Sequence, residues 1–228
     1  MTPGLADALR QGTRALHGEV ERTAFMHTLL HGQMERAAYC LLLRNLHALY
    51  ATLESAWGAH QKHPLLAPLH EPRLFRSAAL ACDLEFLHGP GWAYALDLQP
   101  ASQDYLLRLH ALADGAPDLL VAHVYVRYLG DLSGGQQLKR ILARSLALPA
   151  GADGTAFYDF GDAQQTAALT RIFRQQLAGL PALEGDVDRI VAEARDAFGR
   201  HSQLFDQLAA ATGLLRPEAP ALPNLRNP

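Results

Sequence analysis

Lysine and cysteine are both rare in this chain. Only two of its 20 basic residues are lysines, Lys62 and Lys139, and only two of its 228 residues are cysteines, Cys40 and Cys82. There is no CxxC pair and no Cys/His spacing typical of zinc, which excludes a structural zinc module and a disulfide framework. Both cysteines fall in apolar helical stretches, so we expect two buried free thiols in a reducing compartment.

Long apolar runs are also missing. No segment approaches the roughly 20 apolar residues that a membrane-spanning helix needs. The first residues, MTPGLADALRQG, lack the apolar core of a secretory signal peptide. The net charge of −3 provides no broad basic surface for nucleic acid. We therefore expect a cytoplasmic protein that binds neither a membrane nor a nucleic acid.

Sustained alternation of polar and apolar residues is absent, and the sequence therefore predicts no β-sheet. Apolar residues recur instead at helical spacing. Helices are expected at about residues 24–31, 35–61, 73–87, 101–114, 118–147, 162–179 and 185–212, preceded by two short helices over residues 5–20 with Gly12 as the candidate break. The predicted fold class is all-α, with one domain over residues 1–212 and a proline-rich, disordered tail over residues 213–228.

One motif suggests an ATPase. The stretch GDLSGGQQLKRILARSLAL, residues 130–148, contains the five letters LSGGQ of the ABC-type signature. Such an ATPase also needs a GxxxxGK[ST] loop, whose backbone amides and lysine cradle the phosphates. Neither Lys62 nor Lys139 lies in that frame, and no apolar strand ends in an aspartate that could hold magnesium. The match is a coincidence, and the glycines need another explanation.

The glycines of this stretch destabilise the expected helix, because a glycine within a helix is about 1 kcal/mol less stable than an alanine. Gly130 and Gly134 share one helical face, as do Asp131 and Gly135. A face without side-chain bulk allows close approach of either a partner helix or a flat ligand, and the glycines alone do not decide between them. Asp131 lies one turn from Arg127, where it either forms an ordinary ion pair or organises water beside a ligand.

His17 is distinguished from the other ten histidines by its neighbours. Arg10, Arg14 and Glu21 fall near its face of the expected helix. A neutral imidazole is a common iron ligand, and a nearby carboxylate can orient it through its second nitrogen. Arginines alongside could bind carboxylates of a ligand, although a solvated or hydrogen-bonded histidine is the alternative. The absence of HExxH and of repeated ExxH argues against zinc proteases and di-iron bundles.

Five blocks follow one another along the chain in an order that matches a known family. They are LRQGTRALHGEVER at residues 9–22, LHALYATLE at 46–54, ALACDLEFLHGPGW at 79–92, LLVAHVYVRYLGDLSGGQQLKRI at 119–141 and ARDAFGRHSQLFDQL at 194–208. In these blocks the sequence resembles the biliverdin-forming haem oxygenases, in their soluble bacterial form. The resemblance implies a single all-α domain in which haem is sandwiched between a proximal and a distal helix.

The resemblance also implies roles for individual residues. His17 would ligate the haem iron, Glu21 would support His17, and Asp131 would hold the distal water that delivers protons to dioxygen bound at the iron. The other matching positions are the distal glycines Gly130, Gly134 and Gly135; the polar network members Arg127, Tyr50 and Tyr105; the pocket-lining aromatic residues Phe198 and Phe205; and the propionate-binding positions Arg10, Arg14, Tyr125 and Arg174.

Two positions depart from the family pattern. Thr170 stands where the family has a lysine, one turn before Arg174, with Arg171 adjacent. His201 stands where the animal enzymes have an asparagine in the distal network. The propionate anchor and the outer proton path therefore differ from those of the family.

The function implied by the resemblance is oxidative cleavage of haem at a meso carbon to biliverdin, CO and ferrous iron. Haem would be both cofactor and substrate, dioxygen the oxidant, and ferredoxin or another reductase the electron donor. A non-catalytic haem carrier or sensor of the same fold is the alternative. A third class is a helical enzyme without iron on a similar fold, such as a thiamin-degrading enzyme.

Overall fold

The computed structural model describes residues 4–149 and 153–214, and none of these residues forms a β-strand. The helices are α1 (Leu5–Glu21), α2 (Ala24–Leu30), α3 (Arg36–Ala59), α4 (Ser77–Leu87), α5 (Trp92–Ala95), α6 (Pro100–Gly115), α7 (Leu120–Val124), α8 (Gly130–Ser145), α9 (Ala163–Ala178) and α10 (Glu184–Ala211). The short elements η1 (Ala67–Leu69), η2 (Pro72–Leu74), η3 (Pro117–Leu119), η4 (Tyr125–Leu129) and η5 (Ala156–Tyr158) lie between them. The all-α prediction is confirmed.

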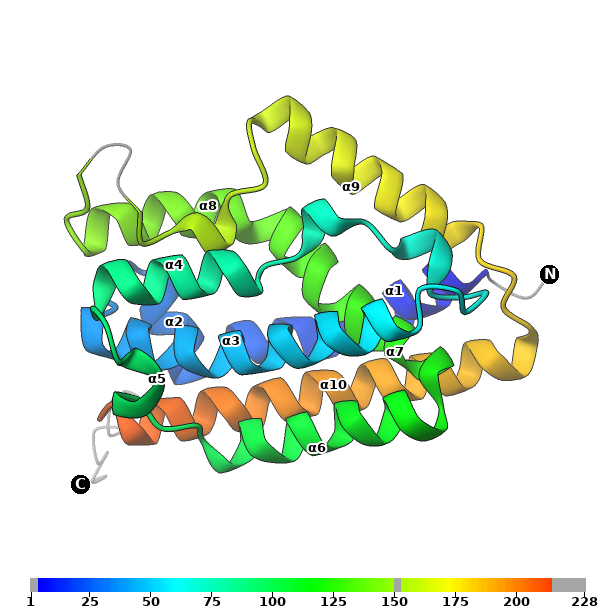
Figure 1. Ribbon diagram of the computed structural model, residues 1–228, viewed down its shortest axis with the longest axis horizontal. Coiled ribbons are helices and arrows are strands. Elements are labelled where there is room, and N and C mark those ends of the chain that lie inside the picture. The colour runs from blue at the N-terminus through cyan, green and yellow to red at the C-terminus, as the bar shows by residue number, and fades with distance from the viewer. Residues whose placement is uncertain (1–3, 150–152, 215–228) are drawn as a thin grey trace, which may run out of the picture.

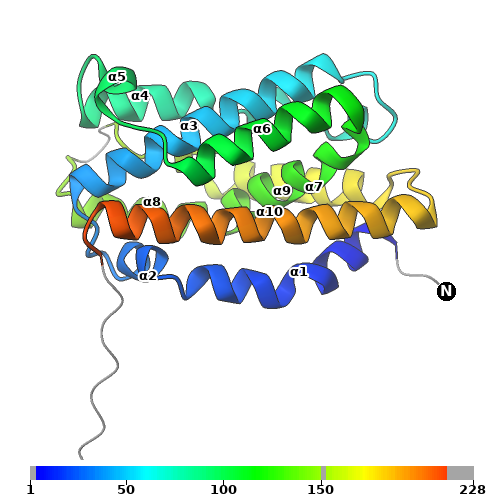
Figure 2. The ribbon, with the colours of Figure 1, turned by 90° about the horizontal axis from the view of Figure 1, so that it is seen from below.

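The two longest helices, α3 and α10, run lengthwise through the molecule with α6 against both (Figure 1). Seen from below, α10 separates α1 and α2 on one side from α3 and α6 on the other (Figure 2). α9 crosses the top of the view in Figure 1 at an angle to the other helices. This arrangement brings α1, α8 and α10 close enough to share a cleft.

One face of α3 shows how the core also positions the site. Tyr39, Leu43, Leu46, Tyr50 and Trp57 recur at helical spacing and are all at most 3% exposed. Burying each large apolar side chain contributes about 1.5–3 kcal/mol. The same periodicity that drives α3 into the core therefore fixes Tyr50 in the interior, where its hydroxyl needs a polar partner.

Several helix boundaries have local causes that the sequence carries. Asp162 and Gln165 form a capping box at the start of α9, with hydrogen bonds of 2.7 and 2.8 Å. Pro100 occupies the first turn of α6, where its missing N–H costs nothing. Gly32 ends the second helical segment in the left-handed region, at φ +66°. The expected helix at 73–87 starts later, at Ser77, because Pro72–Leu74 forms a separate 3₁₀ turn.

The expected break at Gly12 is wrong. α1 continues unbroken from Leu5 to Glu21, and Gly12 permits close packing instead. A Cβ at this position would lie 2.6 Å from Val191 Cγ1 on α10. Arg195, also on α10, donates from Nε to the Gly12 carbonyl at 3.0 Å. The glycine thus brings two helix backbones together without ending either.

The single helix expected at 118–147 is also wrong. The structure divides it into α7, the π-helical segment η4 (Tyr125–Leu129) and α8. A π-helix adds a residue to the turn and is often found at functional sites. Here it directly precedes Gly130 and contains Arg127, so it sets the direction from which these residues face the cleft.

Two smaller predictions have different outcomes. Cys40 is buried as expected, whereas Cys82 is exposed, because it lies on the face of α4 opposite the buried Leu80 and Leu84. The expected disordered tail falls on residues 213–228, of which 215–228 lie outside the described residues. Among the described helices, none combines the length and the apolar character that crossing a membrane requires.

Candidate functional site

Two adjoining cavities form a cleft between α1 and α8. One, here called the Asp131 cavity, has a volume of about 400 Å³ and is lined by residues of α1, α2, α3, α8, η4, η5 and α10. The other, here called the Arg10 cavity, has a volume of about 510 Å³ and lies along α1, η4, α8, α9 and α10. They share the lining residues His17, Val126, Gly130, Ser133 and Phe198. The shared wall makes the two cavities one continuous binding region.

His17 projects from α1 into this region. Its side chain is 57% exposed and lines both cavities. Nδ1 lies 3.6 Å from Glu21 Oε1, one turn along the helix, so Nε2 is the nitrogen left for a ligand. The Phe198 ring contacts the imidazole edge-on, with centroids 6.1 Å apart. The expected pairing of His17 with Glu21 is therefore present, and a carboxylate at this place favours a fixed ring orientation.

The glycines of α8 have two different environments. A Cβ added to Gly130 or Gly134 would meet nothing within 4 Å, and both residues line the cleft. A Cβ on Gly135 would instead lie 3.5 Å from the Tyr158 ring and carbonyl. Close packing accounts for Gly135, and the flat-ligand explanation stays a prediction for Gly130 and Gly134. Gly130 and Gly134 leave room for a ligand, whereas Gly135 packs against η5 and lies outside the cleft.

We expect Gly134→Ala to separate stability from ligand binding. The unfolding free energy of the ligand-free protein should rise by about 1 kcal/mol, because alanine is the better helix former. The added methyl occupies the cleft, and overpacking of this kind should weaken ligand binding about tenfold. Chemical denaturation measures the first effect, and a titration with haem, the ligand that the family resemblance implies, measures the second. Gly199→Ala is the matched control, since Gly199 lies within α10 with open space around it; equal weakening by both variants would contradict the assignment.

Asp131 sits at the centre of a buried polar network beside these glycines. The Tyr50 hydroxyl donates to Asp131 Oδ2, and Arg127 donates from Nε to the same hydroxyl at 3.0 Å. Arg127 Nη2 lies 3.7 Å from Asp131 Oδ1. Tyr50 comes from α3, Arg127 from η4 and Asp131 from α8, so three elements fix the carboxylate. The interior position excludes the reading of an ordinary surface ion pair.

Burial and charge act in opposite directions on this network. Burial raises the pKa of Asp131, while Arg127 and the Tyr50 hydroxyl favour its ionised form. Burial also raises the pKa of Tyr50 well above its ordinary value, so this phenol stays protonated as a donor. Burial opposes the charge on Arg127, but Tyr50 and Asp131 outweigh it and raise the pKa of Arg127. The result is a charged guanidinium beside a carboxylate at the edge of a cavity.

Tyr105 belongs to a second network behind the first. Its hydroxyl lies 2.8 Å from His123 Nδ1, and His123 Nε2 lies 3.0 Å from Glu193 Oε1. Arg108 holds the same carboxylate through two nitrogens. Burial opposes ionisation of Glu193, but His123 and Arg108 outweigh it and lower its pKa to about 2. A cavity of about 10 Å³ separates Tyr105 from Tyr50 and Arg127, room for at most one water molecule.

Neither expected tyrosine of the distal network lines the cleft. Tyr50 reaches it only through its hydrogen bonds with Asp131 and Arg127, and Tyr105 lies deeper still. Arg127 and Asp131 line the Asp131 cavity directly, as do Glu21, Phe198 and Phe205. The Phe205 ring stacks on Phe25 of α2 at 6.0 Å.

The sequence reasoning missed the aromatic floor of the Asp131 cavity. Phe157 and Tyr158 line it from η5, a single 3₁₀ turn in the connection between α8 and α9. Asp83 of α4 holds this loop by accepting hydrogen bonds from the backbone N–H groups of Gly154, Ala156 and Phe157 at 2.8–2.9 Å. The aromatic residues clustered in AFYDF, residues 156–160, were the only sequence signal of this floor. Helical periodicity cannot show where so short a segment packs.

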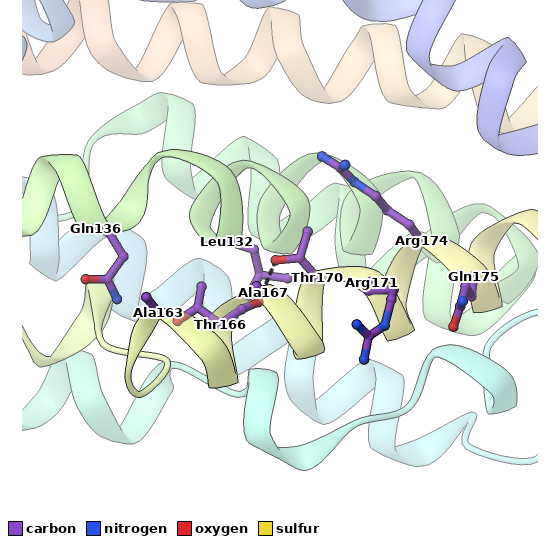
Figure 3. Close-up of a pocket in the computed structure, with 9 residues that line it drawn as sticks. All are labelled: Leu132, Gln136, Ala163, Thr166, Ala167, Thr170, Arg171, Arg174 and Gln175. Carbon is purple, nitrogen blue, oxygen red and sulfur yellow. Dashed lines mark hydrogen bonds between the residues drawn. The ribbon is translucent and has the colours of Figure 1, made fainter.

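The residues expected to bind propionates divide into two groups. Arg10, Tyr125 and Arg174 line the Arg10 cavity, whereas Arg14 is exposed outside both cavities. Thr170 also lies outside them, and its hydroxyl donates to the Thr166 carbonyl at 2.7 Å within α9. It faces a separate groove between α8 and α9, where Arg171 and Arg174 point in different directions (Figure 3).

The fold and the cleft together define an all-α protein that can hold a flat ligand between two helices, with a histidine on one and a glycine face on the other. Comparison with known proteins gives the family. The profile described as "Heme oxygenase" matches residues 3–207. Heme oxygenase 1 of Synechocystis sp. is 39% identical over 208 residues, which are 91% of this chain and 86% of that protein. The chain belongs to the heme oxygenase family.

Further relatives agree with this membership. Heme oxygenase 1 of Homo sapiens is 37% identical over 209 residues, 91% of this chain and 73% of the human protein. The crystal structure of heme oxygenase-2 from Synechocystis sp., in complex with heme and NO, superposes with a TM-score of 0.88 at 39% identity. That likeness covers 92% of this chain and 86% of the other.

Proposed function

We propose that this protein cleaves haem at a meso carbon to biliverdin, CO and ferrous iron, using dioxygen and an external electron donor. The observation that carries the proposal is the opposition of His17 and the open glycine face of α8, with the Asp131 carboxylate beside that face. Membership of the family supports the same conclusion. A carrier needs a ligand and a pocket but has no need of a buried, charge-supported carboxylate at the pocket edge.

The residues present fit haem. His17 offers an imidazole nitrogen at the wall shared by both cavities, and the facing helix has no side chain at Gly130 and Gly134, where a Cβ would meet nothing. Arg10 and Arg174 line the Arg10 cavity, where their guanidinium groups could bind the propionates. Bound haem would supply the iron that activates dioxygen and the ring that is oxidised.

The chain's own residues do the remaining work. Asp131 would hold water at its carboxylate while Tyr50 and Arg127 keep that carboxylate oriented. Protons for the reaction would pass from this water, in the manner of general acid catalysis. Phe198 and Phe205 would exclude bulk water from the α10 side of the cavity, and Gly134 would leave space beside the ring edge.

A single-tube turnover assay tests the proposed function. The purified protein is mixed with hemin and a reductant, either ferredoxin with its reductase or ascorbate, in air. We expect the Soret band to decay and the absorbance of biliverdin to appear, with isomer analysis of the product identifying the meso carbon. A Soret spectrum that persists unchanged would instead establish a carrier or sensor. A spectrum that stays that of free hemin when the protein is added would exclude haem as the ligand.

We further propose an acidic electron donor, such as a ferredoxin, that docks near the exposed side of α1. Arg10, Arg14 and Arg22 are all exposed on or next to this helix, close to His17 and therefore to the haem edge. Charge-steered association speeds encounter and is screened by salt. The rate of haem reduction by ferredoxin should therefore fall as ionic strength rises, and a rate independent of salt would contradict this docking site.

A further inference from the structure

Gly12 makes a close contact with α10 that the proposed mechanism does not use. Here α1 runs along α10 (Figure 2). A Cβ on Gly12 would lie 2.6 Å from Val191 Cγ1, much closer than the roughly 3.5–4.0 Å at which packed carbon atoms lie. Val191 cannot readily turn away, because a β-branched side chain in a helix has one strongly preferred rotamer. A larger residue at position 12 would therefore push the two helices apart.

Arg195, one turn after Val191 on α10, completes this contact. It donates from Nε to the Gly12 carbonyl at 3.0 Å. Its Nε and Nη2 both lie 3.7 Å from the place that a Cβ of Gly12 would take, so the guanidinium lies directly against the bare backbone. A hydrogen bond from a charged donor is stronger and more directional than one between neutral groups. Arg195 therefore restrains α1 in a way that apolar packing alone does not.

The position of α1 determines where its cavity-lining residues lie. Four residues at helical spacing form this lining in the Arg10 cavity: Ala6, Arg10, Thr13 and His17. The helix is unbroken from Leu5 to Glu21, and His17 follows Gly12 by only about 7.5 Å along the axis. A displacement of α1 at Gly12 is therefore carried to His17, because no hinge lies between them to absorb it.

The same face of α10 also contacts the His17 ring. Val191, Arg195 and Phe198 follow one another at helical spacing along this face. Phe198 meets the imidazole edge-on, with the ring centroids 6.1 Å apart. One face of α10 thus holds both the backbone of α1, at Gly12, and the imidazole ring that α1 carries. The first contact sets the distance between the helices, and the second restrains the direction of the ring.

We propose that Gly12 and Arg195 are positioning residues, which set the distance of α1 from α10 and thereby the reach of His17 into the cleft. The consequence for iron ligation rests on the proposed haem function. Neither residue lines either cavity, so both act through His17. A shift of α1 away from α10 would move the imidazole nitrogen relative to the iron and separate the ring from Phe198.

The haem-free protein tests the positioning itself. Nuclear Overhauser effects between the ring protons of His17 and Phe198 report their separation. We expect these effects to weaken in Gly12→Ala and to recover in Gly12→Ala with Val191→Ala, which removes the methyl groups that the new Cβ meets. Gly18→Ala is the matched control on the same helix, because its Cβ would meet only the flexible end of Arg22, at 3.3 Å. Unchanged effects in Gly12→Ala would overturn the proposal.

The haem complex tests the consequence for the iron ligand. Gly12→Ala should weaken hemin binding about tenfold, the loss typical of groups that support a metal ligand, and should lower the iron–histidine stretching frequency of the ferrous complex. Adding Val191→Ala should restore both. A loss of packing alone would lower stability without moving this frequency, and an unmoved frequency in Gly12→Ala would overturn the proposal.

Arg195 provides a test that does not disturb the core, because its side chain is exposed. Arg195→Met removes the donor and should weaken hemin binding about threefold, whereas Arg195→Lys keeps a charged donor and should stay close to wild type. Equal hemin affinity in Arg195→Met and wild type would remove Arg195 from the proposal. If the wild-type protein binds no haem, the proposed function fails, while the haem-free measurement still decides whether Gly12 positions His17.

Discussion

His17→Ala should abolish biliverdin formation. The variant removes the imidazole nitrogen that the cleft offers to iron, and loss of groups that merely support a metal ligand already costs about 10- to 100-fold. We therefore expect turnover to fall more than about 100-fold, with a blue-shifted and weakened Soret band. The side chain is 57% exposed and makes little contribution to the core, so the thermal stability of the haem-free protein should not change.

Exogenous imidazole provides the sharpest test of this role. A small imidazole can enter the space that alanine leaves and should restore part of the Soret spectrum and part of the turnover. His110→Ala, which removes an exposed histidine of α6, should behave as wild type. Undiminished turnover in His17→Ala would refute the assignment of His17 as the ligand, whichever of the other histidines then proved responsible.

The helices were predictable because their cause is local. The spacing of Tyr39, Leu43, Leu46 and Tyr50 marks the buried face of α3 in the sequence itself. The failure at Gly12 has a different origin. Glycine is a poor helix former, yet its place in α1 depends on the approach of Val191, which lies far along the chain. Such a reason exists only once α1 and α10 are packed together.

The candidate site was predictable only in part. The residue pattern singled out His17, Asp131 and the glycines of α8, and the family resemblance implied their roles. The sequence could not distinguish Gly134, which faces the cleft, from Gly135, which contacts Tyr158. The anchoring of η5 by Asp83 of α4 also depends on a tertiary contact. The contact between Arg127 and His201 likewise joins residues far apart in the chain.

The buried charges explain why the departure at His201 and the network at Asp131 must be considered together. Arg127 contacts both residues, as well as Tyr50. A buried guanidinium is stable only when its donors meet acceptors. The imidazole at position 201 supplies one acceptor and the network around Asp131 supplies the others. Replacing either partner therefore changes the orientation of Arg127 at the other.

Asp131→Ala should leave haem binding intact while lowering biliverdin formation about 100-fold, the contribution typical of a positioned proton donor. The variant removes the acceptor of the Tyr50 hydroxyl and leaves Arg127 without its carboxylate, so cavity water is no longer held in place. Reductant should still be consumed, because electron delivery does not need Asp131. Haem titration, reductant consumption and biliverdin yield, measured on one preparation, separate binding from proton delivery.

The dependence on pH distinguishes the charge of Asp131 from its shape. Burial raises the pKa of this carboxyl, so its ionised form declines as pH falls through a pKa higher than the ordinary value of aspartate. If the carboxylate is the active form, wild-type turnover should fall over that interval. Asp131→Asn keeps the size and an acceptor for Tyr50 but cannot ionise, so its residual rate should lack this inflection.

Asp188→Ala, at an exposed position of α10, is the matched loss of charge and should retain wild-type yield. Wild-type biliverdin yield in Asp131→Ala would show that another group organises the water, and Tyr158, which also lines the cavity, would be the next residue to replace.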